Sequence, residues 1–162
     1  MVFVTIGSSE FGFSRLLVEV DRLAGDAVLS DVMAQIGRSD YKPWNCSWKR
    51  FLTPAEFSTW MGNADFIICH AGCGSLEEGL RHGKKIIAVP RRVCHKEAPD
   101  DHQFEIARLL AAHNRILLAN DVDELAARVT EIPTWTPSFA APRNGNPIAE
   151  YITRFISQKM AS

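Results

Sequence analysis

The segment from Phe66 to Gly79 constrains the fold of this 162-residue chain more than any other stretch of its sequence. The apolar run Phe66–Cys69 is followed by two glycines and a serine within Gly72–Ser75, and then by a helix-forming stretch with two carboxylates. This order is typical of a strand, a tight turn and a helix N-terminus, whose backbone N–H groups and positive dipole end suit a phosphate group. A carboxylate one turn further into the helix can accept hydrogen bonds from ribose hydroxyls. The segment therefore indicates a nucleoside-diphosphate site.

The same alternation of strand and helix patterns runs through most of the sequence. Strands are predicted at Val2–Ile6, Val32–Ile36, Arg50–Leu52, Asp65–Cys69, Lys85–Val89 and Arg115–Leu118. Helices are predicted to begin at Ser14, at Thr53, at the glycine turn, at Asp100 or Asp101, and at Asp121 or Asp123. The pattern predicts a single α/β domain with a Rossmann-like parallel sheet covered by helices on both faces.

The helix after residue 53 has the clearest local start signal. Thr53 can cap its first turn, Pro54 suits the first helical position, and Glu56 can close a capping box.

Three loops are expected at one edge of this sheet. Gly7-Ser8, the Gly72–Ser75 turn and the Pro90–Asp101 loop each follow a predicted strand. Ligands of open parallel sheets bind beyond the carboxyl ends of the strands, so the three loops are predicted to share one site.

The end of the chain is predicted to differ from the rest of this domain, which is taken to span residues 1–162. Residues 132–147 are rich in Pro, Thr, Ser and Asn and predict an irregular connector. Residues 148–160 carry an apolar stripe that predicts a last helix, which could dock a protein partner.

Composition excludes some classes of protein. The formal net charge of −1 argues against a nucleic-acid binder with a broad basic surface. The cluster of Trp44, Trp48 and Phe51 with two basic residues could stack on bases, but local packing or a partner contact is favoured. Neither a signal peptide nor a membrane span is expected, which favours a cytoplasmic protein with reduced cysteines. The spacing of Cys69, Cys73 and nearby histidines matches no common zinc pattern, so no metal is predicted.

Five motifs in order resemble glycosyltransferase family 28. They are Val4–Ser8, Ala34–Gly37, Asp65–Ser75, Gly83–Arg92 and Asp101–Gln103. The chain is similar to the C-terminal, nucleotide-sugar-binding half of MurG-like GT-B enzymes. Its stretch from Pro90 to Gln103 most resembles the PssE-type subunits of two-component exopolysaccharide glycosyltransferases.

The resemblance implies a site for a UDP-sugar, with no bound metal and no further cofactor. Its implied contacts with the diphosphate are Gly7, Ser8, Gly72, Gly74 and Ser75. The implied ribose contact is Glu78, and the implied sugar contacts are His102 and Gln103. A GT-B enzyme relies on helix dipoles and basic groups to stabilise the departing diphosphate.

Four further assignments stay open from the sequence. His70 is expected to be structural or to lie close to the sugar nucleotide, and it is a weak candidate for the catalytic base, as is His102. Arg91 and Arg92 either bind the diphosphate or an acidic sugar, or are solvated loop charges or subunit contacts. The catalytic base itself is expected on a partner.

The resemblance also implies that the chain is half of an enzyme. A membrane-associated PssD-like subunit would supply the acceptor site, and the reaction would be an inverting transfer that extends a lipid-linked saccharide in exopolysaccharide or capsule synthesis. The chain would then be recruited to the inner face of the plasma membrane, with a homodimer conceivable when the partner is absent. A non-catalytic nucleotide-sugar-binding or scaffolding module is the alternative. A dinucleotide-binding domain is disfavoured because Gly7–Gly12 lacks the G-x-G-x-x-G order. The sequence does not fix the sugar.

Overall fold

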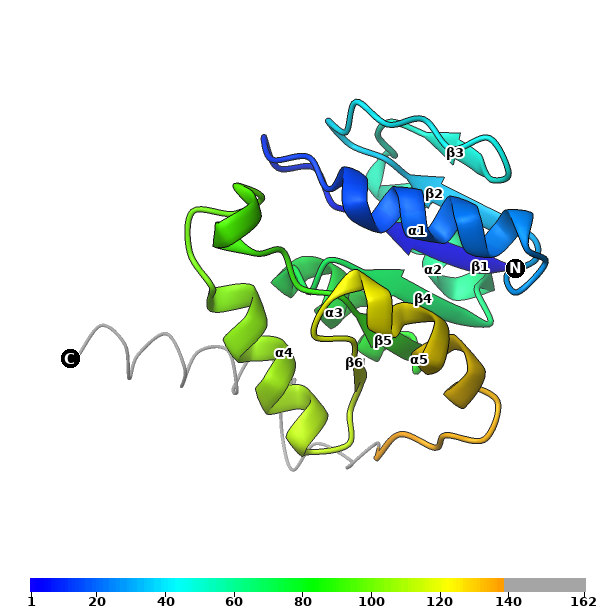
Figure 1. Cartoon of the computed structure of the whole chain (residues 1–162). Helices are drawn as coiled ribbons and strands as arrows, with labels where there is room; N and C mark the ends of the chain where they lie inside the picture. Colours follow the sequence, from blue (N-terminus) through cyan, green and yellow to red (C-terminus); the bar gives the residue numbers. More distant parts are fainter. Residues whose placement is uncertain (139–162) are drawn as a thin grey trace.

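Six parallel strands form one sheet in the order β3-β2-β1-β4-β5-β6 (Figure 1). The structure, a computed structural model, describes residues 1–138. The strands are β1 (Val2–Thr5), β2 (Val32–Gln35), β3 (Ser47–Lys49), β4 (Phe66–Cys69), β5 (Lys85–Ala88) and β6 (Leu117–Leu118). The predicted Rossmann-like α/β sheet is therefore confirmed.

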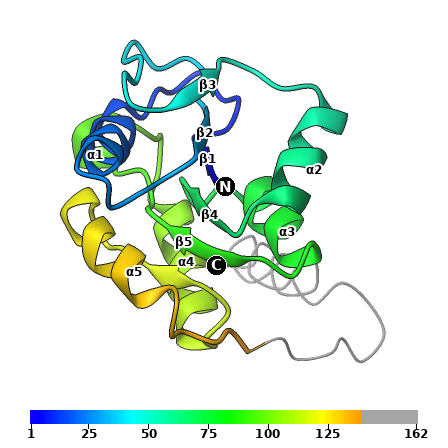
Figure 2. The same ribbon diagram turned by 90° about the vertical axis from the view of Figure 1, so that its right-hand side faces the viewer.

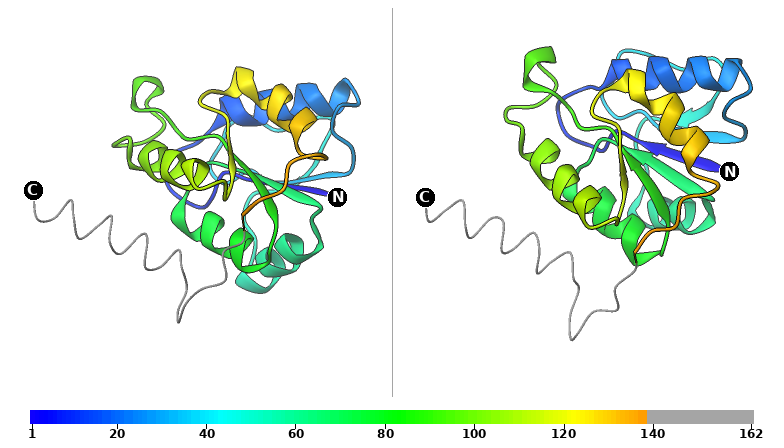
Figure 3. Two further views of the ribbon diagram at one scale, coloured as in Figure 1. Left: turned by 90° about the horizontal axis from the view of Figure 1, so that it is seen from below. Right: turned by 60° about the horizontal axis from the view of Figure 1, so that its bottom comes forward.

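Five α-helices of the described chain cover both faces of the sheet. They are α1 (Ser14–Gly25), α2 (Pro54–Asn63), α3 (Cys73–Arg81), α4 (His102–Ala112) and α5 (Leu125–Glu131), with the 3-10 turns η1 (Val93–His95) and η2 (Val122–Glu124). Helices α1 and α5 lie side by side on one face, and α2 and α3 lie on the other (Figures 2 and 3). Two apolar cores result, one with α1 and α5 and one with α2, α3 and α4.

The alternation of side chains along the strands explains why both cores are apolar. In β4, Ile68 packs in the core under α1 and α5, while Ile67 and Cys69 pack in the opposite core. Successive side chains of a strand point to opposite faces, so a strand buried on both faces needs a continuous apolar run.

Several local expectations are confirmed and several are wrong. The capping box is present, because the Thr53 hydroxyl accepts from the Glu56 N–H at 3.3 Å and the Glu56 carboxylate accepts from the Thr53 N–H at 2.9 Å. The strand predicted at Arg50–Leu52 is wrong, since β3 lies three residues earlier and pairs with β2 through Met33 and Ser47. Pairing with a neighbour decides the register of an edge strand more than local apolar content does.

Helix starts show the same mixture. Ser14 does not cap α1; Phe13 holds the capping position without a side-chain bond, and the Ser14 hydroxyl lies 2.8 Å from that of Ser39. The segment after Asp121 begins as η2 and becomes α5 only at Leu125.

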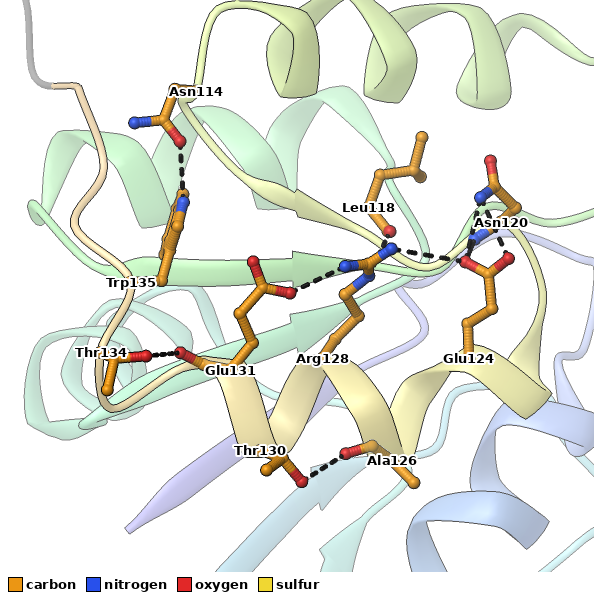
Figure 4. Close-up of polar contacts among 10 residues, drawn as sticks. All are labelled: Asn114, Leu118, Asn120, Glu124, Ala126, Arg128, Thr130, Glu131, Thr134 and Trp135. Carbon is orange, nitrogen blue, oxygen red and sulfur yellow. Dashed lines mark hydrogen bonds and ion pairs between the residues drawn. The ribbon is translucent and has the colours of Figure 1, made fainter.

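The described part of the predicted connector, residues 132–138, is irregular but held in place. The Asn114 side chain accepts from the Trp135 indole N–H at 2.8 Å and donates to the Thr136 carbonyl at 3.0 Å, and the first of these bonds is drawn in Figure 4. In the same view the Arg128 guanidinium joins Glu131 to the Leu118 carbonyl, which fixes α5 against β6. The rest of the connector and the predicted helix at residues 148–160 lie outside the described residues. Among the helices of residues 1–138, none is long and apolar enough to cross a membrane.

The strand order places its reversal between β1 and β4. Chain connections leave β1 toward β2 on one side, while β4 and β5 follow on the other. A crevice opens at the carboxyl end of such a reversal, where sheets of this order bind nucleotides. The two loops that flank it here begin at Ile6 and at His70.

Candidate functional site

The turn between β4 and α3 presents an uncapped helix N-terminus. Gly72 holds the capping position and makes no side-chain cap bond, and the first intrahelical bond runs from the Leu76 N–H to the Gly72 carbonyl at 3.0 Å. The backbone N–H groups of Gly74 and Ser75 therefore precede the intrahelical ladder. A Cβ built at Gly74 would meet no atom within 4 Å, so the space above this turn is open. The geometry suits an anionic group at the helix N-terminus.

The loop after β1 forms the other wall of the crevice. Gly7 has a φ of +74°, a left-handed conformation that favours glycine. Its N–H donates to the Thr5 hydroxyl at 3.1 Å, and that hydroxyl donates to the buried Gln35 amide oxygen at 3.3 Å. Within residues 1–138, the backbone N–H groups of Ser8 and Ser9 have no protein acceptor. Two unused backbone donors therefore follow β1.

His70 lies between these two walls. Its side chain is buried, and its Nδ1 lies 3.3 Å from the Thr5 carbonyl, which assigns the ring proton to Nδ1. A Cβ built at Gly7 would lie 2.7 Å from the His70 ring, and a Cβ at Gly72 would overlap its Nε2. Both glycines are thus required by the imidazole that packs between them.

Burial also fixes the charge of His70. Desolvation by burial, together with the nearby positive charge of Arg91, lowers the pKa of His70 to about 3. The imidazole is therefore neutral at physiological pH. A histidine with its Nδ1 proton held by a carbonyl and its ring enclosed suits a positioning role better than that of a general base.

Arg91 is buried, whereas Arg92 is partly exposed. The Arg91 guanidinium is 2% exposed and donates to the Ile6 carbonyl at 2.6 Å, so its interpretation as a solvated loop charge is wrong. Arg92 donates to the Asn120 carbonyl at 3.3 Å, and its guanidinium lies 4.9 Å from the centre of the Phe104 ring. Direct contact of either arginine with a diphosphate stays a prediction.

Glu78 has protein partners already. Its carboxylate accepts from Arg81 and lies 3.2 Å from the His82 Nε2, and the Arg81 bond is the main cause that holds its pKa below the ordinary value. It is ionised and lies on the sixth position of α3. A ribose contact stays a prediction, and it would have to share the carboxylate with these neighbours.

His102 and Gln103 open α4. The exposed His102 pairs with Asp100, whose carboxylate lies 2.9 Å from Nδ1. The Gln103 side-chain oxygen is screened from solvent and has no hydrogen-bond partner in the described chain. An unpaired amide oxygen fits a ligand hydroxyl, so the sugar contact stays a prediction with this observation in its support.

The structure therefore joins some of the predicted residues and not others. Gly7, His70, Gly72 and Arg91 form one packed cluster at the strand-order reversal. In residues 1–138, no hydrogen bond or ion pair connects Glu78, His102 or Gln103 to that cluster.

Sequence reasoning missed the residues that support the cluster. They are Thr5 and Gln35, which hold Gly7, and the Arg15–Glu97 pair, which joins α1 to the loop before α4. A polar residue as the last member of an apolar strand is the one available signal, and it applies to Thr5 and Gln35. No local pattern marks Glu97 as buried.

The described residues hold no group of three or more His, Cys, Asp or Glu side chains that could bind a metal ion. The absence of metal from the function stays a prediction. Without one, the arrangement can bind an anion through backbone N–H groups and a helix dipole.

An open parallel sheet with glycine turns at the strand-order reversal is typical of nucleotide-binding α/β proteins. The chain belongs to the glycosyltransferase family 28 C-terminal domain family, whose model matches residues 1–147. The predicted family resemblance is thus confirmed, while the narrower resemblance to PssE-type subunits stays a prediction.

Individual relatives agree with this assignment. The chain is 30% identical over 117 residues to the "UDP-N-acetylglucosamine transferase subunit ALG13" of Yarrowia lipolytica, an alignment that covers 72% of this chain and 53% of that protein. The chain therefore spans about half the length of this curated relative. The solution structure of ALG13 has a TM-score of 0.65 at 20% identity, with 93% of each chain covered. MurG of Acinetobacter baumannii has a TM-score of 0.54 at 20% identity, with 81% of this chain and 40% of that one covered. These two likenesses show the fold.

Proposed function

We propose that this chain is the UDP-sugar-binding subunit of a two-component inverting glycosyltransferase. The observation that carries the proposal is the uncapped N-terminus of α3 opposite the unused N–H groups of Ser8 and Ser9, at the reversal of the strand order. Both walls offer backbone donors to a diphosphate, and family membership nominates a sugar nucleotide as the source of that group.

The task of the chain in such an enzyme is to bind the sugar nucleotide and to stabilise the departing UDP. Backbone donors that are already in place act on the negative charge that develops on the diphosphate as the bond to the sugar breaks. The acceptor hydroxyl attacks the anomeric carbon from the opposite side, and its proton leaves to a base. The enclosure of His70 disfavours it as the base. His102 is exposed and its Nδ1 lies 2.9 Å from the Asp100 carboxylate, a pairing that suits a base, so it stays a candidate beside the base that we propose on a partner subunit.

The partner is proposed to be a membrane-associated, PssD-like subunit that carries the acceptor, a lipid-linked saccharide. MurG, which this chain matches over 40% of its length, is consistent with a chain that supplies about half of a GT-B enzyme. The naming of the Yarrowia relative as a transferase subunit supports a heteromeric enzyme, and its printed name nominates UDP-GlcNAc as the first sugar nucleotide to test. A role in exopolysaccharide or capsule synthesis is the pathway that we propose on the resemblance to PssE-type subunits.

Calorimetric titration with UDP tests the proposal, followed by UDP-GlcNAc, UDP-glucose, UDP-galactose and UDP-glucuronate. Glu78→Ala is expected to weaken UDP binding about tenfold, because the ribose loses a charged acceptor. Glu19→Ala is the matched control, since Glu19 also pairs with an arginine three residues later, Arg22, but lies on α1. Wild-type chain that fails to bind UDP, alone and with its co-expressed partner, would contradict the proposal.

A non-catalytic binding module is the second candidate, and the enclosed His70 favours it. The module binds UDP-sugars in the same way but transfers nothing. Incubation of the complex with its partner, a radiolabelled UDP-sugar and a lipid-linked acceptor separates the two functions, because only the enzyme subunit supports labelled product.

A further inference from the structure

Arg91 crosses the carboxyl edge of the sheet to reach the loop after β1. It follows β5, yet Nη2 donates to the carbonyls of Ile6 at 2.6 Å and Phe11 at 2.8 Å. Its Nη1 donates to the Ser9 hydroxyl at 2.9 Å. One guanidinium thus holds three positions between Ile6 and Phe11, in a loop of residues 6–13 that has no helix or strand of its own.

This placement is not favourable in itself. Burial lowers the pKa of Arg91 to about 10, so the charge is retained at neutral pH in a site that disfavours it. Its Nε–H has no hydrogen-bond partner among residues 1–138. A buried charge is weak evidence for a gain in stability. The burial of Arg91 is therefore better explained by the loop geometry that its hydrogen bonds impose.

The acceptors that Arg91 occupies determine which backbone groups of the loop after β1 stay without a partner. Arg91 occupies carbonyl and hydroxyl oxygens, and the Gly7 N–H is taken by the Thr5 hydroxyl. The N–H groups of Ser8 and Ser9 are left without a protein acceptor in the described chain. Since a guanidinium only donates, Arg91 takes none of these backbone donors, which are left for an anion.

A second arginine joins the loop after β5 to the start of α1. Arg15, in the first turn of α1, donates to both carboxylate oxygens of Glu97 at 2.7 and 2.8 Å. Glu97 lies in the loop that begins at Arg91, and its carboxylate also accepts from the Arg92 N–H at 3.2 Å. The loop that begins at Arg91 is thus joined to the loop after β1 by one guanidinium and to α1 by another, and a planar guanidinium fits both contacts.

We propose that Arg91 is a positioning residue that holds the loop after β1 in the conformation that binds the sugar nucleotide's diphosphate, without touching the diphosphate itself. The inference rests on the proposed function, and it assigns the specificity for a diphosphate to a loop that a distant arginine arranges. Arg15 and Glu97 support the arrangement from the other end.

The test compares the affinities of UDP and uridine for Arg91→Met, Arg91→Lys and wild-type chain. Arg91→Met is expected to weaken UDP about tenfold or more and to change uridine, measured by NMR titration, less than about twofold. Arg91→Lys is expected to restore little, because an ammonium group cannot span the three acceptors. Arg22→Met is the control, since Arg22 is exposed on α1 and pairs only with Glu19 and Asp26.

A double-mutant cycle separates positioning from direct contact. Ser9→Ala removes one acceptor of the guanidinium and is expected to weaken UDP about threefold alone, but not in the Arg91→Met background. Backbone order parameters of Ser8 and Ser9 without ligand are expected to fall from about 0.85 to below about 0.6 in Arg91→Met.

Each other result overturns the inference. Loss of UDP binding with unchanged order parameters and additive effects of Ser9→Ala would mean that Arg91 binds the diphosphate directly. Equal losses of UDP and uridine would mean a general structural role, and unchanged UDP binding would mean no role. If Arg91→Met does not fold, an unchanged UDP affinity of Ser9→Ala overturns it. Wild-type chain that binds no UDP defeats the proposed function, and this inference with it.

Discussion

Two loops of this molecule are each organised by one buried charge, and the charges have opposite signs. The loop between β2 and β3 is held by the Asp21 carboxylate of α1, which accepts from the Trp44 N–H at 2.9 Å and the Asn45 N–H at 2.7 Å. The loop after β1 is held by Arg91, which donates to carbonyls. An anion uses up backbone donors and a cation uses up backbone acceptors. Arg91 therefore takes none of the backbone donors of its loop, and the N–H groups of Ser8 and Ser9 have no protein acceptor in residues 1–138.

The two loops also differ in what they present. Trp44 is 90% exposed although its backbone is fixed, so local packing is wrong for this residue of its cluster, while a partner contact stays a prediction. The loop after β1 instead faces His70 and the glycine turn of α3. The two loops thus differ in the backbone groups that a buried charge occupies and in their position relative to the strand-order reversal.

The largest effect is expected from Asp21→Ala, which breaks the first loop alone. Its carboxylate also accepts from the Tyr41 hydroxyl at 2.7 Å, and its removal leaves three donors without an acceptor. The free energy of unfolding is expected to fall by about 3 kcal/mol in urea denaturation, with UDP affinity unchanged.

Asp26→Ala provides the control for this change. Asp26 is exposed at the end of α1 and pairs with Arg22, so its loss is expected to cost less than about 0.5 kcal/mol. A weakened affinity of Asp21→Ala for UDP, measured at a temperature where it is folded, would contradict the separation of the two loops.

Local signals explain the parts of this fold that the sequence predicted. The capping box at Thr53, the apolar runs of β1, β4 and β5, and the glycine turn all act within a few residues. Local signals fail for edge strand β3. Phe51 and Leu52 are apolar and predict a strand, yet Phe51 is 47% exposed and pairing with β2 places the strand at Ser47–Lys49.

The supporting residues of the site could not be predicted in the same way. Arg91 lies 85 residues from Ile6, and Arg15 lies 82 residues from Glu97. A charged residue in a loop is normally solvated, so only the packing of the whole sheet reveals that Arg91 and Glu97 are buried. The motif residues Gly7, Gly72 and Gly74 could be predicted. The physical reason that position 72 requires glycine could not, because it depends on the His70 ring that packs against it.

Gly72 is the residue of the turn before α3 that packs most closely against His70. Gly72→Ala places a Cβ against the His70 ring, which cannot move because it is buried and bonded to Thr5. We expect a loss of about 2 kcal/mol in the free energy of unfolding. Gly74→Ala is the matched variant in the same turn; its Cβ meets no atom, so stability is retained or gains about 0.5 kcal/mol.

The two variants also separate packing from binding. Gly74→Ala is expected to weaken UDP because its methyl group occupies the open space above the helix N-terminus. Gly72→Ala combined with His70→Ala is expected to recover part of the lost stability, since the overlap is removed. A Gly72→Ala variant as stable as wild type would show that His70 does not fill the gap between the walls.

The smallest effect concerns pH and tests whether Arg91 is the one cation inside this cluster. The pKa of His70 is about 3 in the folded chain and about 6.5 in the unfolded chain, so only the unfolded chain binds the proton between these values. Stability that His70 contributes is therefore present above pH 6.5 and is lost as the pH falls.

At pH 5.5 the loss of stability relative to pH 7.5 is expected to be about 1.4 kcal/mol larger in wild type than in His70→Asn, whose amide can keep the bond to the Thr5 carbonyl. Carboxylates with lowered pKa values, such as Asp21, titrate in both proteins and cancel in the difference. Urea denaturation at the two pH values gives the difference, and NMR titration of the His70 ring assigns it. An imidazole that titrates near 6.5 would place a second positive charge beside Arg91, so Arg91 would not be the one cation in this cluster.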